Sequence, residues 1–260
     1  MPDFINTIDV LGDDAVIDSI IDRTITEFND DHITEVGQYA FYQCAALTAM
    51  DLPNVTEIGV KAFARTSPVA VLNLPKLTIL GNNAFEYASF PDTISFPSLA
   101  ENKHPNGEYC FENATLKNVD LPICKNIAGR MFRNCTIETI NMPNVERVGY
   151  QAFGYYYGRR NKLTTVDLPV CNAIEEYAFD GSQLLTALIL RADVVCANGG
   201  TKTFNDTPIA KGTGYIYVPR ALVDSYKAAT NWSTYASQFR ALEDYTVNGT
   251  ITGALDETKI

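Results

Sequence analysis

Apolar residues follow a phrase that recurs along most of this chain. The phrase reads V-x-x-I-G-x-x-A-F, and its instances begin at Ile33, Val55, Leu77, Cys124, Val145 and Cys171, with a degraded copy at Leu99. Counting the degraded copy, successive starts are 22, 22, 22, 25, 21 and 26 residues apart. Repetition at such a period is typical of solenoids, in which a unit cannot bury its own apolar side and stacks on its neighbours. The sequence therefore predicts a stack of coils, with length variation confined to a few inserted stretches.

Short segments in which apolar and polar residues alternate lie between these phrases, and most of them end in proline. They span residues 47–53, 69–75, 92–97, 116–122, 137–143, 163–169, 185–191 and 213–219. Alternation with period two predicts half-buried strands, and a proline is tolerated where strand pairing stops. We expect each unit to contain one strand, a turn and an irregular or short helical return.

Stacking of these units predicts three interior columns of side chains. The first column contains Met50, Leu72, Ile94, Val119, Ile140, Val166, Leu188 and Ile216. The second contains Leu52, Leu74, Phe96, Leu121, Met142, Leu168, Leu190 and Val218. The third is a phenylalanine spine of Phe41, Phe63, Phe85, Phe111, Phe132, Phe153 and Phe179. The glycines of the phrase, Gly37, Gly59, Gly81 and Gly149, are expected to supply a positive backbone angle at a turn.

This pattern resembles the BspA-type leucine-rich repeat over roughly residues 33–219. Repeats of this type occur in bacterial and protist surface proteins and in phage-encoded proteins. The resemblance implies an α/β repeat solenoid, a right-handed leucine-rich-repeat horseshoe with parallel strands on its concave face. About eight repeats of ~22 residues would fill residues 33–219. The 99–123 and 193–219 units depart from the phrase, which leaves their local geometry open.

A solenoid needs a cap at each end of its core. Residues 1–32 predict an N-terminal helical cap, a helix plus a strand, in which Asp13 or Asp14 caps the helix. Its apolar face would hold Val16, Ile17, Ile20 and Ile21, and the segment RTITEF would form the strand. This helix could cover the first coil, or it could pack against a second copy of the chain.

Residues 220–245 predict a C-terminal helical cap. Apolar residues there follow a helical spacing that is broken at Thr230–Asn231, which indicates two short helices. The single tryptophan, Trp232, is expected in the core of this cap. The segment also resembles the end of many BspA-type arrays. Residues 246–260 predict a polar tail, mobile or used for attachment.

Composition excludes several classes of partner. The chain has 260 residues, of which 46% are hydrophobic, so it can bury a sizeable core. Its formal net charge of −11 repels nucleic-acid phosphate and anionic lipid. We therefore expect no nucleic acid and no membrane insertion. No signal peptide or apolar span is visible in the sequence.

Candidate chemistry is sparse. The six cysteines form no CxxC pair; Cys44, Cys124, Cys135 and Cys171 occupy repeat positions and are expected to be buried thiols. The two histidines, His32 and His104, fall in unrelated contexts. The sequence contains no GxSxG, HExxH or P-loop motif. We therefore predict that the protein is not an enzyme and that it has no catalytic residues, metal site or cofactor.

Two surfaces are candidates for ligand binding. Outward strand positions form a polar ladder of Asp51, Asn73, Ser95, Asp120, Asn141 and Asp167, which changes to Ile189 and Tyr217. A second outward ladder of mostly small residues ends at Tyr215. The inserted loop FGYYYGRRNK carries Tyr155, Tyr156, Tyr157, Arg159 and Arg160, a composition enriched at recognition hot spots. Two alternatives remain open. The ladder side chains could only bond the neighbouring turn, and the arginines could pack on the tyrosines to steady the loop.

These features favour a non-catalytic binding or adhesion module that presents its repeat surface to a protein or glycan ligand. We expect it to be extracellular, at a bacterial cell surface or on a phage virion, and a start at Met1 would suit synthesis as a phage component. The alternative is a structural or assembly protein of a larger particle. Such a protein would attach, or form a homo-oligomer, through the N-terminal helix or the C-terminal tail.

Overall fold

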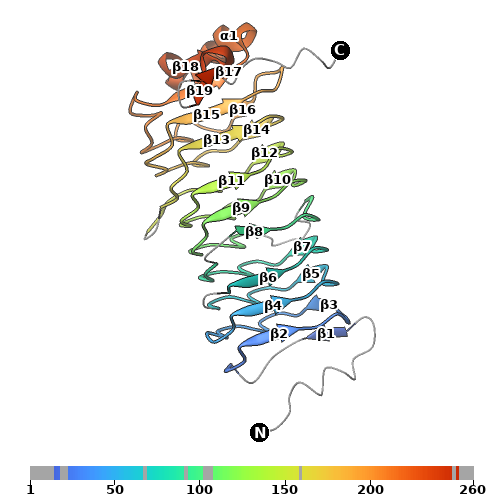
Figure 1. Ribbon diagram of the computed structural model, residues 1–260. Helices are drawn as coiled ribbons and strands as arrows, with labels where there is room; N and C mark the ends of the chain where they lie inside the picture. The colour runs from blue at the N-terminus through green and yellow to red at the C-terminus, as the bar shows by residue number, and fades with distance from the viewer. Residues whose placement is uncertain are drawn as a thin grey trace, which may run out of the picture.

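The computed structural model describes residues 15–17, 23–66, 69–90, 93–101, 108–157, 160–247 and 250–251. These residues form an elongated parallel solenoid of about 9 coils with a short helical segment at its C-terminal end (Figure 1). The predicted stack of repeats is therefore confirmed. The content of helix is much lower than the α/β class implied, because the described coils are built from short strands and turns.

One side of the stack, which we call the ladder face, contains the predicted strands. Its strands are β2 (Glu27–Asn29), β4 (Ala49–Asp51), β6 (Val71–Asn73), β8 (Thr93–Ser95), β9 (Asn118–Asp120), β11 (Thr139–Asn141), β13 (Thr165–Leu168), β15 (Ala187–Leu190) and β17 (Tyr215–Val218). They pair in parallel as three successive sheets, β2-β4-β6, β8-β9-β11 and β13-β15-β17. Each strand thus repeats its predecessor one coil further along.

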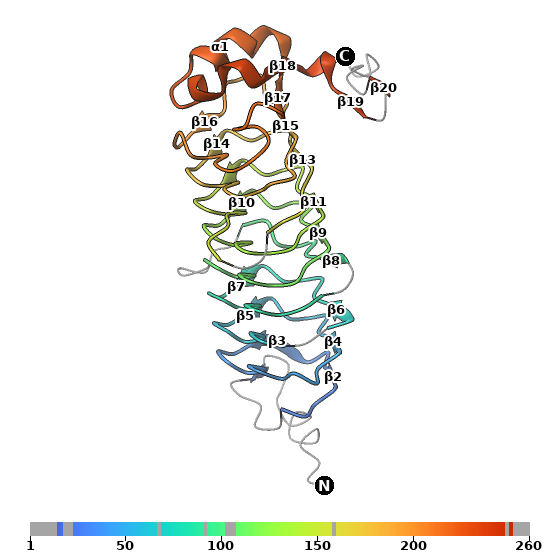
Figure 2. The same cartoon turned by 90° about the vertical axis from the view of Figure 1, so that its left-hand side faces the viewer.

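A second strand series, which the sequence analysis missed, forms the phrase face. It comprises β1 (Ala15–Ile17), β3 (Ile33–Val36), β5 (Glu57–Ile58), β7 (Ile79–Leu80), β10 (Asn126–Ile127), β12 (Arg147–Val148), β14 (Ala173–Ile174) and β16 (Ala197–Asn198). They pair in parallel as β1-β3-β5-β7 and β10-β12-β14-β16. Figure 2 shows the two series on different sides of the stack. The return predicted as irregular or helical is therefore extended along part of its length.

The third side, the turn face, consists of the residues from two before to two after each spine phenylalanine. Here the phenylalanine N–H donates to the carbonyl of the residue before the next phenylalanine, as in Phe41 to Ala62 at 2.7 Å and Phe132 to Ala152 at 2.9 Å. Residues two before and two after the ring repeatedly adopt positive φ, for example Lys61 at 54°. The turns are therefore tied from coil to coil like the strands.

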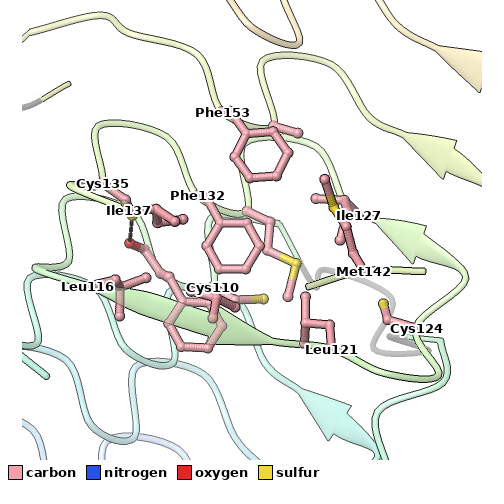
Figure 3. Packing of buried hydrophobic residues seen from close by; sticks show 14 of the residues in the cluster. Cys110, Leu116, Leu121, Cys124, Ile127, Phe132, Cys135, Ile137, Met142 and Phe153 are labelled. Atoms are coloured by element: carbon pink, nitrogen blue, oxygen red, sulfur yellow. Dashed lines mark hydrogen bonds between the residues drawn. The ribbon is translucent and has the colours of Figure 1, made fainter. Parts of the chain in front are cut away.

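The predicted core columns are buried, and the phenylalanines stack face to face. Centroids of successive rings from Phe41 to Phe179 lie 4.8 to 5.5 Å apart, with interplanar angles of 15° or less. Figure 3 shows Phe153 above Phe132, with Leu116 and Ile137 on one side and Leu121 and Met142 on the other. All six cysteines are buried. The spine and the buried thiols are thus confirmed, and Leu72 and Ile140 are partly buried members of their column.

The two units with divergent sequences retain the core of the fold. Phe111 of the 99–123 unit stacks 5.2 Å from Phe85. The 193–219 unit contributes β16 and Phe204, whose ring lies 5.6 Å from that of Phe179 at an angle of 3°. The spine is therefore one residue longer than the sequence analysis predicted.

The coils stack along a nearly straight axis in both views, unlike the horseshoe that the resemblance implied (Figures 1 and 2). Curvature arises when one side of each repeat is wider than the other, since packed helices lie about 8–10 Å apart and paired strands about 4.8 Å. Here the ladder, phrase and turn faces are all joined by backbone hydrogen bonds between coils. The spacing is therefore similar on each side, and the ladder face is not concave.

The N-terminal helix prediction is wrong for Ala15–Ile17, which form β1 and pair in parallel with β3. Asp13, Asp14, Ile20 and Ile21 lie outside the described residues. The β-branched Val16 and Ile17 suit a strand as well as an apolar helix face. The open edge of β3 offers backbone partners that a short helix lacks.

The C-terminal cap agrees with its prediction. It contains η2 (Arg220–Leu222), α1 (Val223–Ala228) and η3 (Trp232–Gln238), and the break falls at Asn231, which has φ 63°. Trp232 is buried and stacks 5.9 Å from Phe204. Next come β18 (Phe239–Ala241), which pairs with β17, then η4 (Leu242–Asp244), β19 (Thr246–Val247) and β20 (Thr250–Ile251). No helix among the described residues is long and apolar enough to cross a bilayer.

The phrase glycines do not have the positive φ predicted for them, and Gly59, Gly81 and Gly149 instead serve close packing between coils. Among described glycines, only Gly181 and Gly212 have positive φ. A Cβ on Gly81 would lie 2.5 Å from the Gly59 carbonyl carbon, and one on Gly149 would lie 2.8 Å from Gly129 N. The side chain is absent because the preceding coil's backbone occupies its space.

We predict that Gly81→Ala lowers the free energy of unfolding by about 1–3 kcal/mol, because a new Cβ would press on backbone that cannot move aside. Gly129→Ala is the matched control, since its Cβ would lie 3.5 Å from the flexible Glu108 side chain. Urea unfolding of both variants measures the difference. Equal stability of the two variants would contradict the packing explanation.

Candidate recognition surface

The polar ladder on the ladder face is bonded within itself. Asn73 Nδ2 donates to Asp51 Oδ1 at 2.7 Å, and Asn141 Nδ2 donates to Asp120 Oδ1 at 2.7 Å. Ser95 Oγ donates to Asp120 Oδ2 at 2.8 Å. A bond to the neighbouring turn was one interpretation of these residues in the sequence, but their partners are ladder residues of an adjacent coil. These side chains therefore link coils, although most of them remain exposed.

Asp167 continues the ladder with a stronger contact. Arg191 donates through Nε to Asp167 Oδ1 at 3.0 Å and through Nη2 to Oδ2 at 2.8 Å. This two-pronged contact raises the pKa of the guanidinium. Asp167 is thus engaged by a charged partner from the following coil.

The aromatic end of the ladder is packed against the C-terminal segment. The guanidinium carbon of Arg240 lies 4.4 Å from the Tyr215 ring centroid, and the Tyr217 and Tyr245 rings lie 4.8 Å apart. Burial raises the pKa of Tyr217, and Tyr245 adds to this effect. The outward position of Ile189 is only 2% exposed. The predicted aromatic platform is therefore half-covered by the chain itself.

Within the inserted loop, Tyr155 and Arg160 have structural contacts. The Arg160 guanidinium carbon lies 3.7 Å from the Tyr155 ring centroid, and Nη1 donates to Gly181 O at 3.1 Å and to Asp206 Oδ2 at 2.9 Å. Gly181 has φ 72°, and a Cβ there would lie 2.6 Å from Tyr155 Cβ. Arginine stacking that steadies the loop, the alternative from the sequence, applies to these two residues.

Asp206 is the anchor for this contact. Its carboxylate accepts from Lys211 at 2.6 Å, from Gln183 at 2.8 Å and from Arg160. These donors lower the pKa of Asp206 to about 2, and the hydrogen bond from Lys211 makes the largest contribution. The loop is thus fastened to the two coils that follow it.

Tyr156 and Tyr157 project from the same loop. The two residues are 59% and 72% exposed, and their rings meet edge to face with centroids 4.5 Å apart. The Tyr156 N–H donates to Asn134 Oδ1 at 2.9 Å, which fixes the backbone beneath the pair. Arg159 lies outside the described residues.

These tyrosines continue a row of aromatic and cationic side chains that the sequence analysis missed. The Arg133 guanidinium carbon lies 5.7 Å from the Tyr156 ring and 5.0 Å from Tyr109. That of Arg130 lies 5.1 Å from Tyr109 and 4.9 Å from Tyr150. We call Tyr109, Arg130, Arg133, Tyr150, Tyr156 and Tyr157 the tyrosine–arginine belt.

Carboxylates hold the arginines of the belt in place. Arg133 forms an ion pair with Glu112, which is buried, and Arg130 lies 3.3 Å from Glu108 Oε2. Arg130 Nε also donates to Gln151 Oε1 at 3.1 Å. The guanidinium groups are therefore oriented by the protein before any partner arrives.

The signal for the belt lay in the variable positions of the repeat. Tyr109 and Arg130 stand two residues before a spine phenylalanine, and Arg133 stands one after. Aligning the phrases coil by coil and reading the variable columns would have placed these residues side by side.

The N-terminal end of the ladder face carries Asp30, Asp31 and His32. Their ligand atoms lie within 4.8 Å of one another. Asp30 Oδ1 accepts from the backbone N–H groups of His32 and Ile33 at 2.7 and 3.1 Å, so this carboxylate closes a turn. His104 lies outside the described residues.

Substitution of a loop residue with structural contacts should lower stability more than substitution of an exposed loop residue. We predict that Arg160→Ala lowers the free energy of unfolding by about 1–3 kcal/mol, because it removes the Arg160 hydrogen bonds to Asp206 and to the Gly181 carbonyl and the stacking on Tyr155. Tyr157→Ala should change it by less than about 0.5 kcal/mol, since the ring is mostly in solvent. Thermal or urea unfolding of both variants checks this, and a larger loss for Tyr157→Ala would refute the assignment.

No curated protein matches the sequence. A leucine-rich repeat protein from Bacteroides ovatus ATCC 8483 aligns at 18% identity with a TM-score of 0.49, covering 75% of this chain and 56% of that one. This chain thus spans little more than half of that protein. A leucine rich cell surface protein from Faecalibacterium prausnitzii A2-165 aligns at 13% identity with a TM-score of 0.30, covering 82% of each chain.

The family comparison is more decisive. The family described as BspA type leucine rich repeat region matches residues 34–158 and 106–213. Together these ranges take in well over half of the 260 residues and coincide with the stack of coils. The chain therefore belongs to the BspA type leucine-rich repeat family.

Proposed function

We propose that this protein is a non-catalytic recognition module that binds a protein partner through the tyrosine–arginine belt. The observation that carries the proposal is the exposed pair Tyr156 and Tyr157, 59% and 72% exposed, next to the oriented Arg133. Tyrosine and arginine dominate the energetics of protein interfaces, since both combine a large flat surface with hydrogen-bonding groups.

The fixed geometry of the belt supports this proposal. Binding costs free energy when side chains must be ordered, by about 0.5–1.5 kcal/mol for each flexible one. Arg130 and Arg133 already lie against tyrosine rings and carboxylates, so a partner would have little to immobilise. A protein partner is favoured because the belt crosses several coils and mixes cationic, aromatic and acidic groups, as protein interfaces do.

We place this module outside the cell, at a bacterial surface, as the BspA-type resemblance implies. The alternative role in assembling a larger particle relied on an apolar N-terminal helix or on the C-terminal tail. The helix gives that role no support, because Ala15–Ile17 form β1 within the phrase face.

The test is binding to an array of bacterial surface and extracellular proteins at several salt concentrations. We expect the unchanged protein to bind at least one of them, and the double variant Tyr156→Ser/Tyr157→Ser to bind it at least ~30-fold more weakly, as for loss of a hot spot. Asn141→Ala is the matched control, since it alters the ladder face and leaves the belt intact. Its affinity should stay within about twofold, a change of under 0.5 kcal/mol.

Three outcomes would contradict the proposal. Failure of the unchanged protein to bind any protein on the array removes the protein partner. Binding on a parallel glycan array alone replaces it with a carbohydrate. A larger loss for Asn141→Ala than for the tyrosine variant moves the binding surface to the ladder face. Melting temperatures of both variants must match that of the unchanged protein for the comparison to hold.

A further inference from the structure

Two thiols meet inside the last coils of the stack. Cys171 and Cys196 are both fully buried, and their sulfur atoms lie 3.9 Å apart. Cys171 stands eight residues before Phe179, and Cys196 stands eight residues before Phe204. Cys171 lies two residues before β14 and Cys196 lies one residue before β16, so the two cysteines stand in adjacent coils with an offset of one residue in the strand register.

The backbone around the pair suits a cross-link. Ala197 N–H donates to Asn172 O at 2.8 Å, and β14 pairs in parallel with β16. Paired strands lie about 4.8 Å apart, and an offset of one residue adds about 3.3 Å along the strand, which gives a Cα separation of roughly 6 Å. A disulfide requires about 4.4–6.8 Å between Cα atoms. The sulfur atoms lie 3.9 Å apart, so they must approach by about 1.9 Å to reach the ~2.05 Å length of a disulfide bond.

We propose that Cys171 and Cys196 are a disulfide-forming pair that locks the final coil of the solenoid to the one before it. The inference is independent of the recognition proposal, since the pair lies inside the stack and the belt lies on its surface. The co-reactant is a low-molecular-weight disulfide such as oxidised glutathione.

The contact between the thiols assigns their roles in this exchange. The Cys196 S–H donates to Cys171 Sγ, which lowers the pKa of Cys171, while the same contact and burial raise the pKa of Cys196. Cys171 is therefore the attacking sulfur, because the thiolate is the nucleophile in thiol–disulfide exchange.

The reaction proceeds in two balanced steps. The Cys171 thiolate attacks one sulfur of the small disulfide, forms a mixed disulfide and releases one thiolate. Cys196 then gives up its proton and attacks the Cys171 sulfur, which forms the protein disulfide and releases the second thiolate. The two cysteines lose two electrons and two protons, and the small disulfide is reduced to two thiols.

Cys196 lies directly against the C-terminal cap, and this position determines what a Cys171–Cys196 disulfide would stabilise. Tyr226 Oη accepts from Cys196 N–H at 2.9 Å, and Trp232 Nε1 donates to Cys196 O at 2.6 Å. The C-terminal cap thus covers this cysteine and shields it from solvent. We expect oxidation during folding, before the cap closes, and the bond then holds in place the coil on which the cap is seated.

The experiment refolds the full chain from denaturant in buffer with reduced and oxidised glutathione. Peptide mapping without reductant should yield peptides containing Cys171 and Cys196 joined, with a mass two hydrogens below their sum. The oxidised protein should melt roughly 5–10 °C higher than the reduced one, as expected for a closed loop of this length. Reductant in denaturant, followed by refolding, should reverse the shift.

Variants separate this pair from the other cysteines. Cys196→Ala should abolish both the cross-link and the redox-dependent shift in melting temperature. Cys124→Ala is the matched control, because Cys124 lies two residues before β10 as Cys171 lies two residues before β14, and Val145 stands at this position in the next coil. The Cys124→Ala control should retain both the cross-link and the redox-dependent shift in melting temperature. Six free thiols after oxidative refolding, a cross-link between another pair, or an unchanged melting temperature in the cross-linked protein would overturn the proposal.

Discussion

Backbone hydrogen bonds tie each coil to the next on three sides, and the spacing they impose governs the rest of the structure. Strands pair in parallel on the ladder and phrase faces, and the phenylalanine N–H groups bond the next coil on the turn face. Coils are therefore held near the ~4.8 Å separation of paired strands. Phenylalanine rings can stack face to face at this separation between coils. From Phe41 to Phe204 the rings of the spine stack with centroids 4.8 to 5.6 Å apart. A uniform spacing on each side also keeps the axis nearly straight.

The same spacing explains sequence features whose purpose could not be recognised from one repeat. Glycine in the phrase was interpreted as a local turn residue, whereas at Gly81 the restriction comes from backbone of the preceding coil. Positive φ falls instead on side-chain-bearing residues such as Lys61 and Arg65. That conformation is unfavourable for such residues. It recurs because it directs alternate N–H groups toward the next coil.

Sequence periodicity was sufficient to predict the stack, its core columns and the C-terminal cap, since these depend on apolar residues recurring at fixed intervals. The phrase-face strands were missed because two-residue elements such as β5 carry too little pattern to detect. The composition of the inserted loop singled it out, but the sequence could not distinguish the tyrosine that is covered from the two that are exposed. Tyr155 is covered because Gly181 and Asp206, from later coils, position Arg160 against it. The belt depends equally on which residues become neighbours once coils are in register.

Regular coils direct their polar side chains at one another, and this limits what they can offer a partner. Asp51 with Asn73, and Asp120 with Asn141, each bond across one coil step, so a ligand on the ladder face would have to replace bonds already made. The insertion after Phe153 adds residues that have no equivalent in the adjacent coils and so no such bonding partner at the same repeat position. Tyr156 and Tyr157 fall outside the repeat positions and stay exposed, while the backbone below them is anchored to Asn134. Specific recognition is therefore favoured where the repeat is broken locally on a rigid stack.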